Sequence, residues 1–257
     1  LYILAALVGG FIGIWQLRNM KSRSHYAVAV AYIFAAYALV SLSWCLMWNY
    51  GARSVGIAVM MSFINGLISV ILTVGTLPLL ETAFSITTEI RLMELSNLNH
   101  PLLKKLMIEA PGTYNHSILV GNLAEAAADQ IGANGLLVRV ASYFHDIGKT
   151  KRPNFYVENQ KPGENPHDKL QPSLSTFIIT SHTKEGADMA RKYKLPVEII
   201  DIIEQHHGTG VLKGFYNKAL EQAKNAEAAT APVRMEDFCY PGPIPQTREA
   251  ALVMLAD

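Results

Sequence analysis

Three stretches in the first 80 residues contain no Asp, Glu, Lys or Arg. They cover residues 1–17, 26–52 and 54–80. Each approaches or exceeds the roughly 20 residues that an α-helix needs to cross a bilayer. Helices in the core of a soluble protein normally keep a polar face, and these stretches have none. The sequence therefore predicts three membrane spans in contact with a lipid bilayer, at about 1–17, 26–48 and 54–80.

Basic residues beside the spans predict the orientation of the chain. The first loop carries Arg18, Lys21 and Arg23, whereas the second carries only Arg53. Because basic loops stay on the cytoplasmic side, we expect the first loop inside and, after a third span, everything beyond Glu81 in the cytoplasm. The chain is then a multi-pass protein of the cell membrane. It starts inside an apolar stretch without Met, so we also expect a piece of a longer protein.

Charge and cysteine content exclude several classes of protein. The net charge of +1 and the pI near 7.9 provide no broad basic surface, so polymeric nucleic acid is not an expected partner. Cys45 lies in an apolar stretch and Cys239 in a proline-rich one. The two cysteines form neither a disulfide framework nor a CxxC metal site, which favours a reducing compartment.

The part after residue 80 has the composition of a soluble domain, and we expect it to be all-α. A helical linker is expected over 81–110 and a catalytic domain over 111–257. The apolar spacing predicts helices at about 81–95, 102–110, 113–130, 136–149, 173–193, 197–206, 215–228 and from 247 onward. Two long loops, 152–172 and 230–246, separate them, and loops of this length are often functional.

Histidines and one aspartate form the pattern that carries chemistry. Six of the eight histidines follow Pro111. Five of them lie in or beside predicted helices: His116, His145, His182, His206 and His207. A single helical histidine is usually a surface or core residue. As a set with the adjacent Asp146, they are the imidazole and carboxylate ligands that iron, manganese and zinc accept.

The His145–Asp146 doublet resembles the HD phosphohydrolase superfamily. The resemblance implies one metal ion held by His116, His145, Asp146 and Asp257. Asp257 is the last residue of the motif Val-Met-Leu-Ala-Asp at 253–257. In the two-metal branch three further histidines follow, which correspond to His182, His206 and His207. The resemblance implies that Asp146 bridges two divalent transition-metal ions, iron or manganese, with zinc as an alternative. Adjacent helical residues point about 100° apart, so both His206 and His207 reach one ion only near a helix end, which Gly208 supplies.

Longer motifs are similar to those of the seven-transmembrane HD family. They are Glu-Ala-Pro-Gly-Thr-Tyr-Asn-His-Ser at 109–117, His-Asp-Ile-Gly-Lys-Thr-Lys-Arg-Pro at 145–153, Asn-Pro-His-Asp-Lys-Leu at 165–170, Gln-His-His-Gly-Thr at 205–209 and Tyr-Pro-Gly-Pro at 240–243. One type of bacterial member of this family consists of cyclic di-AMP phosphodiesterases. The resemblance therefore implies hydrolysis of a cyclic dinucleotide to linear pApA, with the C-terminal spans of a polytopic protein preceding an HD domain.

Other residues have open interpretations. Asp146 and Lys149 are the expected catalytic residues, with Lys149 contacting the phosphate as a point charge or else lying solvated at a helix end. Lys151 and Arg152 are expected as surface charges. His167 either lines the substrate cleft or is an exposed loop residue, and the second is favoured. His25 and His100 are not expected to bind metal.

Alternative functions remain at this point. They are hydrolysis of cyclic di-GMP or another nucleotide, and a receptor that binds nucleotide without turnover. A transporter is disfavoured because the spans carry no charge. A homo-oligomer is compatible with the sequence.

Overall fold

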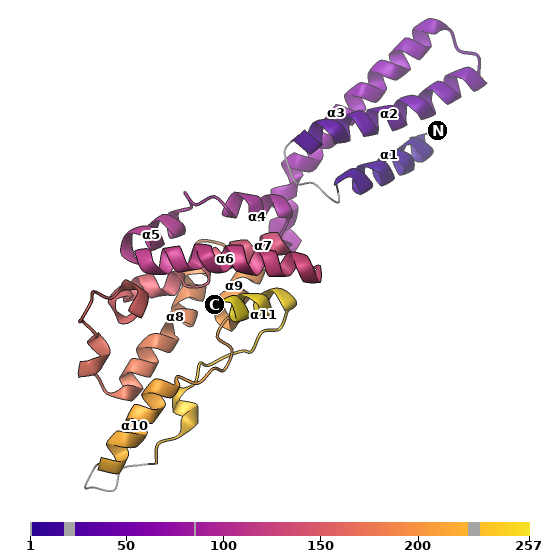
Figure 1. The fold of residues 1–257 in the computed structure, drawn as a ribbon. Coiled ribbons are helices and arrows are strands. Elements are labelled where there is room, and N and C mark those ends of the chain that lie inside the picture. Colours follow the sequence, from indigo (N-terminus) through magenta and orange to yellow (C-terminus); the bar gives the residue numbers. More distant parts are fainter. Residues whose placement is uncertain (1, 18–23, 85, 226–231) are drawn as a thin grey trace. The chain divides into compact units, whose positions relative to one another are not determined.

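The computed structural model describes residues 2–17, 24–84, 86–225 and 232–257 (Figure 1). The chain divides into two compact units, Leu1–Ile90 and Arg91–Asp257. Each unit has a hydrophobic cluster of its own.

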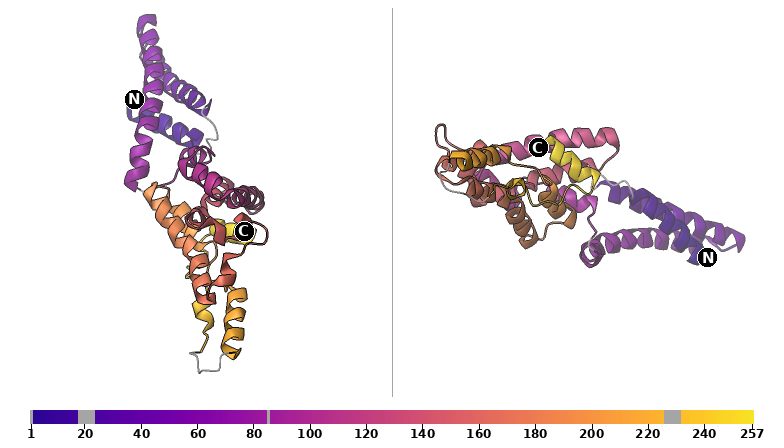
Figure 2. Two further views of the ribbon diagram at one scale, coloured as in Figure 1. Left: turned by 90° about the vertical axis from the view of Figure 1, so that its left-hand side faces the viewer. Right: turned by 90° about the horizontal axis from the view of Figure 1, so that it is seen from below.

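The N-terminal unit consists of α1 (Tyr2–Leu17), α2 (Ser24–Met47) and α3 (Ala52–Phe84). The helix α2 packs against both α1 and α3, and the three lie alongside one another (Figure 1, Figure 2). Gly66 permits the close approach of α3 to α2, because a Cβ atom there would lie 3.2 Å from the backbone nitrogen of Phe34.

Two helical stretches in this unit are long and apolar enough to cross a membrane. They are Tyr26–Met47, with 22 residues, and Ala52–Glu81, with 30 residues. In α1 the apolar stretch Ala6–Trp15 is shorter, so the third span stays a prediction. Three of the basic residues that predict the orientation, Arg18, Lys21 and Arg23, lie outside the described residues.

The C-terminal unit is all-helical in the part that the structure describes, as predicted. Its α-helices are α4 (Glu89–Leu95), α5 (Pro101–Glu109), α6 (Pro111–Ile131), α7 (Gly135–Phe144), α8 (Pro172–Lys192), α9 (Val197–Gln205), α10 (Lys213–Asn225) and α11 (Arg248–Ala256). The described β-structure is one isolated antiparallel bridge between Val211 and Cys239. The core includes the fully buried side chains of Leu103, Phe144 and Ile203.

The predicted linker helix over 81–95 is interrupted, which corrects the expectation. The helix α3 ends at Phe84 and α4 begins at Glu89. Across the break, the Thr88 hydroxyl donates a hydrogen bond to the Glu81 carboxylate.

The predicted helix over 136–149 also ends early, at Phe144. Asp146 leaves the helical conformation with a φ of −107°, and a 3-10 helix, η1 (Ile147–Lys151), follows. The reason is packing against α8, because a Cβ atom on Gly148 would lie 2.0 Å from the carbonyl oxygen of His182. This close contact places Asp146 beside His182.

The long loop predicted over 152–172 contains three short 3-10 helices, η2 (Pro153–Phe155), η3 (Val157–Asn159) and η4 (Pro166–Lys169). Arg152 anchors its start by donating hydrogen bonds to Ser181 (2.9 Å) and Glu185 (2.8 Å) on α8. In its middle, the Asn159 side-chain oxygen accepts from the backbone nitrogen of Gly112 (2.9 Å), at the start of α6. The segment is thereby fixed between α6 and α8. The second long loop contains η5 (Met235–Phe238).

Candidate metal centre

The fold brings all seven expected ligand residues together. They come from α6 (His116), the end of α7 (His145, Asp146), α8 (His182), the end of α9 (His206, His207) and the end of α11 (Asp257). They form two groups, in each of which one ligand atom per residue lies within 4.8 Å of the others. We name these groups the buried set, Asp146, His182, His206 and His207, and the outer set, Asp146, His116, His145 and Asp257.

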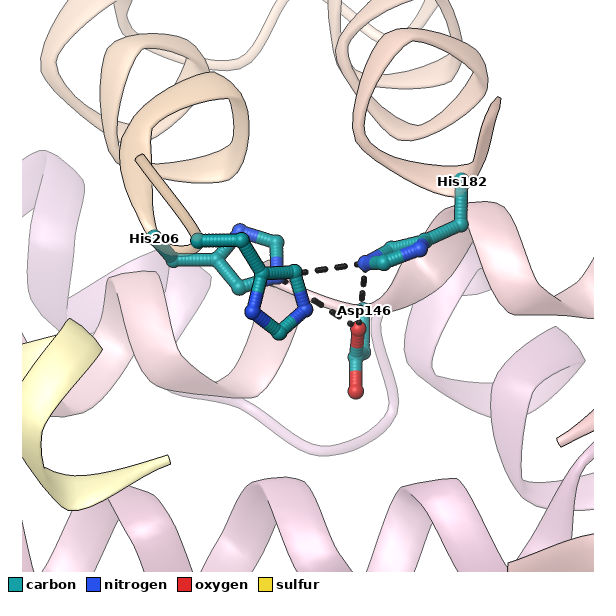
Figure 3. Close-up of side chains that lie close together, drawn as sticks. Asp146, His182 and His206 are labelled. Carbon is teal, nitrogen blue, oxygen red and sulfur yellow. Dashed lines mark hydrogen bonds and ion pairs between the residues drawn. The ribbon is translucent and has the colours of Figure 1, made fainter. Parts of the chain in front are cut away.

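Asp146 belongs to both sets, and each carboxylate oxygen faces one of them. Its Oδ1 atom lies 3.2 Å from His182 Nε2 and 3.7 Å from His206 Nε2 (Figure 3). Its Oδ2 atom lies 3.2 Å from His145 Nε2 and 2.6 Å from Lys149 Nζ. The carboxylate is buried, and neither oxygen accepts a well-directed hydrogen bond from the described residues.

Three imidazoles are held in one tautomer. The Nδ1 atoms of His145, His182 and His206 each lie 2.6–2.7 Å from the carbonyl oxygen three residues earlier in the chain. Because a carbonyl can only accept, each Nδ1 carries a proton, and Nε2 is the nitrogen that faces the centre. Such backbone bonds orient histidine ligands in metal sites.

Two of these Nε2 atoms need a cation between them. The Nε2 atoms of His182 and His206 lie 3.3 Å apart, and both face the Asp146 carboxylate. An acceptor that faces another acceptor in a buried site is unfavourable unless a positive charge lies between them. The chemistry of this donor set therefore fits a divalent metal ion.

Electrostatics differ between the two sets. Burial lowers the pKa of His206 to about 4, against the opposing effect of Asp146. Burial, with His206 and His182 adding to it, lowers the pKa of His207 to about 2. Both rings are therefore neutral at pH 7, as metal ligands must be.

In the outer set the pKa of His145 is shifted in the opposite direction, upward. Burial lowers its pKa, but the carboxylates of Asp146 and Asp257 outweigh burial and raise it to about 10. The pKa of Asp146 is well below its usual range, because His145 and Lys149 outweigh the effect of burial. Proton and metal ion therefore compete for the same imidazole nitrogen in this set.

Asp257 closes the outer set. Its Oδ1 atom lies 2.7 Å from His116 Nε2 and 3.3 Å from His145 Nε2. Its Oδ2 atom lies 3.5 Å from Nδ1 of His207, a member of the buried set. The helix α11 carries it into place, since Thr247 caps the start of the helix and Val253 packs in the core.

Lys149 is held inside the site. Its Nζ atom lies 3.0 Å from Glu158 Oε1, in addition to its contact with Asp146, and its side chain is 12% exposed. The interpretation of Lys149 as a solvated helix-end residue is therefore wrong. Glu158 in turn accepts from the Thr113 hydroxyl (2.8 Å). Sequence reasoning missed Glu158, because no local pattern links it to a lysine nine residues away.

The remaining candidates lie as follows. Lys151 is exposed, and Arg152 makes the structural contacts with α8 described above. His100 caps α5, with its Nδ1 atom accepting from the backbone nitrogen of Leu102 (3.3 Å). His167 is only 6% exposed, so the favoured interpretation of an exposed loop residue is wrong. The side chain of His25 lies outside those that the structure describes.

A cavity of about 560 Å³ opens beside the centre. Members of both ligand sets and Lys149 line it, together with Phe155, Tyr156, Glu158, His167, Phe215 and Tyr240. Tyr240 stacks on His207 with a centroid distance of 4.2 Å, and Tyr156 meets His182 edge-on at 5.7 Å. The motif Tyr-Pro-Gly-Pro at 240–243 thus begins at the wall of the site.

Comparison with known proteins agrees with this geometry. The family model described as HD domain matches residues 113–257, and the model described as 7TM receptor with intracellular HD hydrolase matches residues 1–88. The chain is 46% identical over 253 residues to "Cyclic-di-AMP phosphodiesterase PgpH" of Bacillus subtilis, covering 98% of the chain and 35% of the relative. It is 53% identical over 196 residues to the protein of the same name from Listeria monocytogenes, covering 76% of the chain and 26% of the relative. The chain thus spans about a third or less of the length of these curated relatives.

A solved structure is also similar. It is the crystal structure of the L. monocytogenes phosphodiesterase PgpH HD domain in complex with cyclic-di-AMP. The TM-score is 0.57 at 53% sequence identity, covering 63% of this chain and 72% of that one. The chain therefore belongs to the HD-domain family, in the form in which a helical membrane part precedes the HD domain.

Proposed function

We propose that this chain is the catalytic part of a metal-dependent phosphodiesterase that hydrolyses cyclic di-AMP to linear pApA. The observation that carries the proposal is the Asp146 carboxylate, whose two oxygens face two separate sets of metal-type ligands. The names of the similar proteins supply the substrate, a cyclic dinucleotide with adenine bases.

The two sets would hold two divalent transition-metal ions, iron or manganese, with zinc as the alternative. The outer set would hold one ion and the buried set the other, with Asp146 serving both. Two such ions together hold a phosphate oxygen, make a hydroxide nucleophile available at neutral pH and stabilise the leaving oxygen.

Residues of the chain would position the two ions and the substrate phosphate. The negative charge of Asp146 offsets the repulsion between two nearby cations. Lys149 faces the cavity and is the candidate donor to a phosphate oxygen of the substrate. Burial lowers the pKa of Lys149, but Asp146 and Glu158 outweigh it and raise the pKa above its usual range, so the ammonium stays charged at neutral pH.

The membrane part would be multi-pass, with the catalytic domain in the cytoplasm where cyclic dinucleotides are found. The basic loop of Arg18, Lys21 and Arg23 supports this orientation. A reporter fused after Glu81 tests it. Activity of an enzymatic reporter that works only outside the cytoplasm would contradict the orientation.

One experiment tests the function as a whole. The purified chain is analysed for bound metal, and its products from cyclic di-AMP and cyclic di-GMP are followed from the earliest times. We expect two ions per chain, preference for cyclic di-AMP and pApA as the first product. AMP as the first product, or preference for cyclic di-GMP, would contradict the proposed substrate, and binding without turnover would make the protein a receptor.

A further inference from the structure

Lys149 lies between two carboxylates that come from different parts of the fold. Its Nζ atom is 2.6 Å from Asp146 Oδ2 and 3.0 Å from Glu158 Oε1. Asp146 belongs to both ligand sets, whereas Glu158 belongs to neither. The contact with Glu158 is a well-directed hydrogen bond, but Asp146 Oδ2 accepts no such bond from the described residues. The ammonium is thus paired by charge with Asp146 and by a directed hydrogen bond with Glu158.

Glu158 is held in place by the first turn of α6. Its Oε1 atom also accepts from the buried hydroxyl of Thr113 (2.8 Å), and that hydroxyl accepts from the side-chain nitrogen of Asn159 (2.8 Å). The backbones of α6 and η3 pack tightly here, because a Cβ atom on Gly112 would lie 1.9 Å from the Glu158 carbonyl oxygen. The position of the Glu158 carboxylate is therefore set by α6 and η3 rather than by the ligand sets.

An ion in the outer set would compete with Lys149 for the same oxygen. Asp146 Oδ2 faces that set, 3.2 Å from His145 Nε2, and an ion held there needs its lone pair. A divalent ion and an ammonium that share one carboxylate oxygen repel each other. The repulsion is strong here, because Asp146 is buried and the side chain of Lys149 is only 12% exposed. The ammonium therefore has to leave Oδ2 when the ion binds.

We propose that Glu158 is a positioning residue that keeps the Lys149 ammonium when the outer set binds its ion. In the metal-free chain the ammonium neutralises Asp146, and in the loaded chain it is paired with Glu158 alone. Both residues line the cavity, so the charge stays in the space that a substrate phosphate would enter. Burial raises the pKa of Glu158, but Lys149 outweighs it and holds the pKa below its usual range. The inference rests on the proposed function for the ions and for the role of Lys149.

The test measures binding of Mn²⁺ to the outer set. All variants are made in the full chain carrying His182→Ala, which leaves the outer set complete, and Mn²⁺ is titrated against a chromogenic chelator at pH 7. Glu158→Gln removes the charge but keeps a side-chain oxygen that can accept from Thr113. Without the carboxylate, Lys149 stays at Asp146. Affinity for Mn²⁺ should then fall about tenfold, near the lower limit for one hydrogen bond to a charged group.

The same substitution in a Lys149→Met chain distinguishes this role from simple attraction of the ion by the Glu158 charge. If Glu158 acts through Lys149, Glu158→Gln should change the affinity by less than about twofold once the lysine is absent. If the Glu158 charge attracts the ion directly, the loss would be as large or larger in the Lys149→Met chain, because no ammonium neutralises that charge. This second result would overturn the positioning role.

Glu185→Gln is the matched control. The side chain of Glu185 is 23% exposed against 25% for Glu158, and it pairs with one cation, Arg152 at 2.8 Å. It is not among the residues that line the cavity. The control should bind Mn²⁺ as tightly as the chain from which it was made. A loss equal to that of Glu158→Gln would show that any acidic charge in this region has the same effect, and would overturn the proposal.

Turnover by the chain with His182 in place separates this proposal from the proposed function. If that chain binds two Mn²⁺ ions but does not hydrolyse cyclic di-AMP, the proposed function fails, and the binding measurements still decide the role of Glu158. If it binds no Mn²⁺, both proposals fail. If it hydrolyses cyclic di-AMP and Glu158→Gln leaves Mn²⁺ binding unchanged, the proposed function stands and the positioning role is overturned.

Discussion

The buried set and the outer set share Asp146 but are built in different ways. His182 and His206 are 1% and 0% exposed, and they come from two helices that pack directly on each other. In the outer set, the side chains of His116 and Asp257 are 32% and 12% exposed. Asp146, His182 and His206 of the buried set thus lie in the core, and His207 is 24% exposed, whereas the outer set is completed by α11 and includes the partly exposed His116. If both bind metal, loss of a ligand should have different consequences in each.

The largest effect is expected for Asp146→Ala. The substitution removes a ligand from both sets, and with it the negative charge that offsets the repulsion between two cations. Metal content should fall at both positions, and turnover should fall by about 1000-fold, because two-metal stabilisation contributes several kcal/mol. Added metal should restore little. Metal analysis and turnover measure this, with Asp188→Ala as the control, since Asp188 is 64% exposed on α8. Two ions per chain with near-native turnover would contradict the bridging role.

A smaller effect, and a difference between the sets, is expected for His182→Ala and His116→Ala. Each removes a ligand of one set, so affinity for the ion of that set should fall by at least about 10–100-fold, the loss that follows removal of a residue that only orients a metal ligand, and activity at low metal concentration should fall with it. Excess metal should rescue His116→Ala better, because water can reach its exposed position and replace the imidazole. His182 borders the cavity but is only 1% exposed. Equal rescue of the two variants would show that the sets do not differ in this way.

Sequence motifs predicted which seven residues meet, including the adjacent pair at a helix end. The helix α9 ends at Gln205, and Gly208 follows with a φ of +52°, so the predicted turn after His207 is confirmed. The all-α character and the HD family are likewise confirmed. These predictions succeeded because they depend on short motifs and helical spacing.

Long-range packing could not be predicted in the same way. The spacing across 136–149 fits a helix, and the break after Phe144 is caused by the contact of Gly148 with α8, which is distant in sequence. The burial of His167 depends on Phe215, 48 residues further along the chain by numbering. Neither feature leaves a local pattern.

Gly148→Ala should sharpen the comparison, because it disturbs one set through the backbone. The new Cβ atom would lie 2.0 Å from the His182 carbonyl oxygen and would move η1 away from α8. Overpacking of this kind costs about 1–3 kcal/mol of stability. We expect a lower Tm and preferential loss of the ion of the buried set. The control is Gly214→Ala, because a Cβ atom there meets nothing within 4 Å. A Tm and metal content equal to those of the control would refute the proposed packing constraint.

The smallest expected effect is a difference between the two sets in how their metal affinity depends on pH. The outer set contains His145, whose pKa in the metal-free protein is raised to about 10, so binding of an ion there must release a proton at neutral pH. In the buried set, His206 and His207 have pKa values of about 4 and about 2 and are already neutral. As the pH falls from 8 to 6, the metal affinity of the outer set should therefore fall about tenfold per pH unit, while the metal affinity of the buried set loses nothing through these two rings.

Two variants separate the contributions of the two sets, since His182→Ala leaves the outer set complete and His116→Ala leaves the buried set complete. Titration of each with Mn²⁺ against a chromogenic chelator at pH 6, 7 and 8 gives the two slopes. The slope should be steeper in His182→Ala, because its remaining set contains the ring that holds a proton between two carboxylates. Equal slopes would mean that the proton on His145 does not compete with the ion, and that the two sets differ in exposure but not in charge.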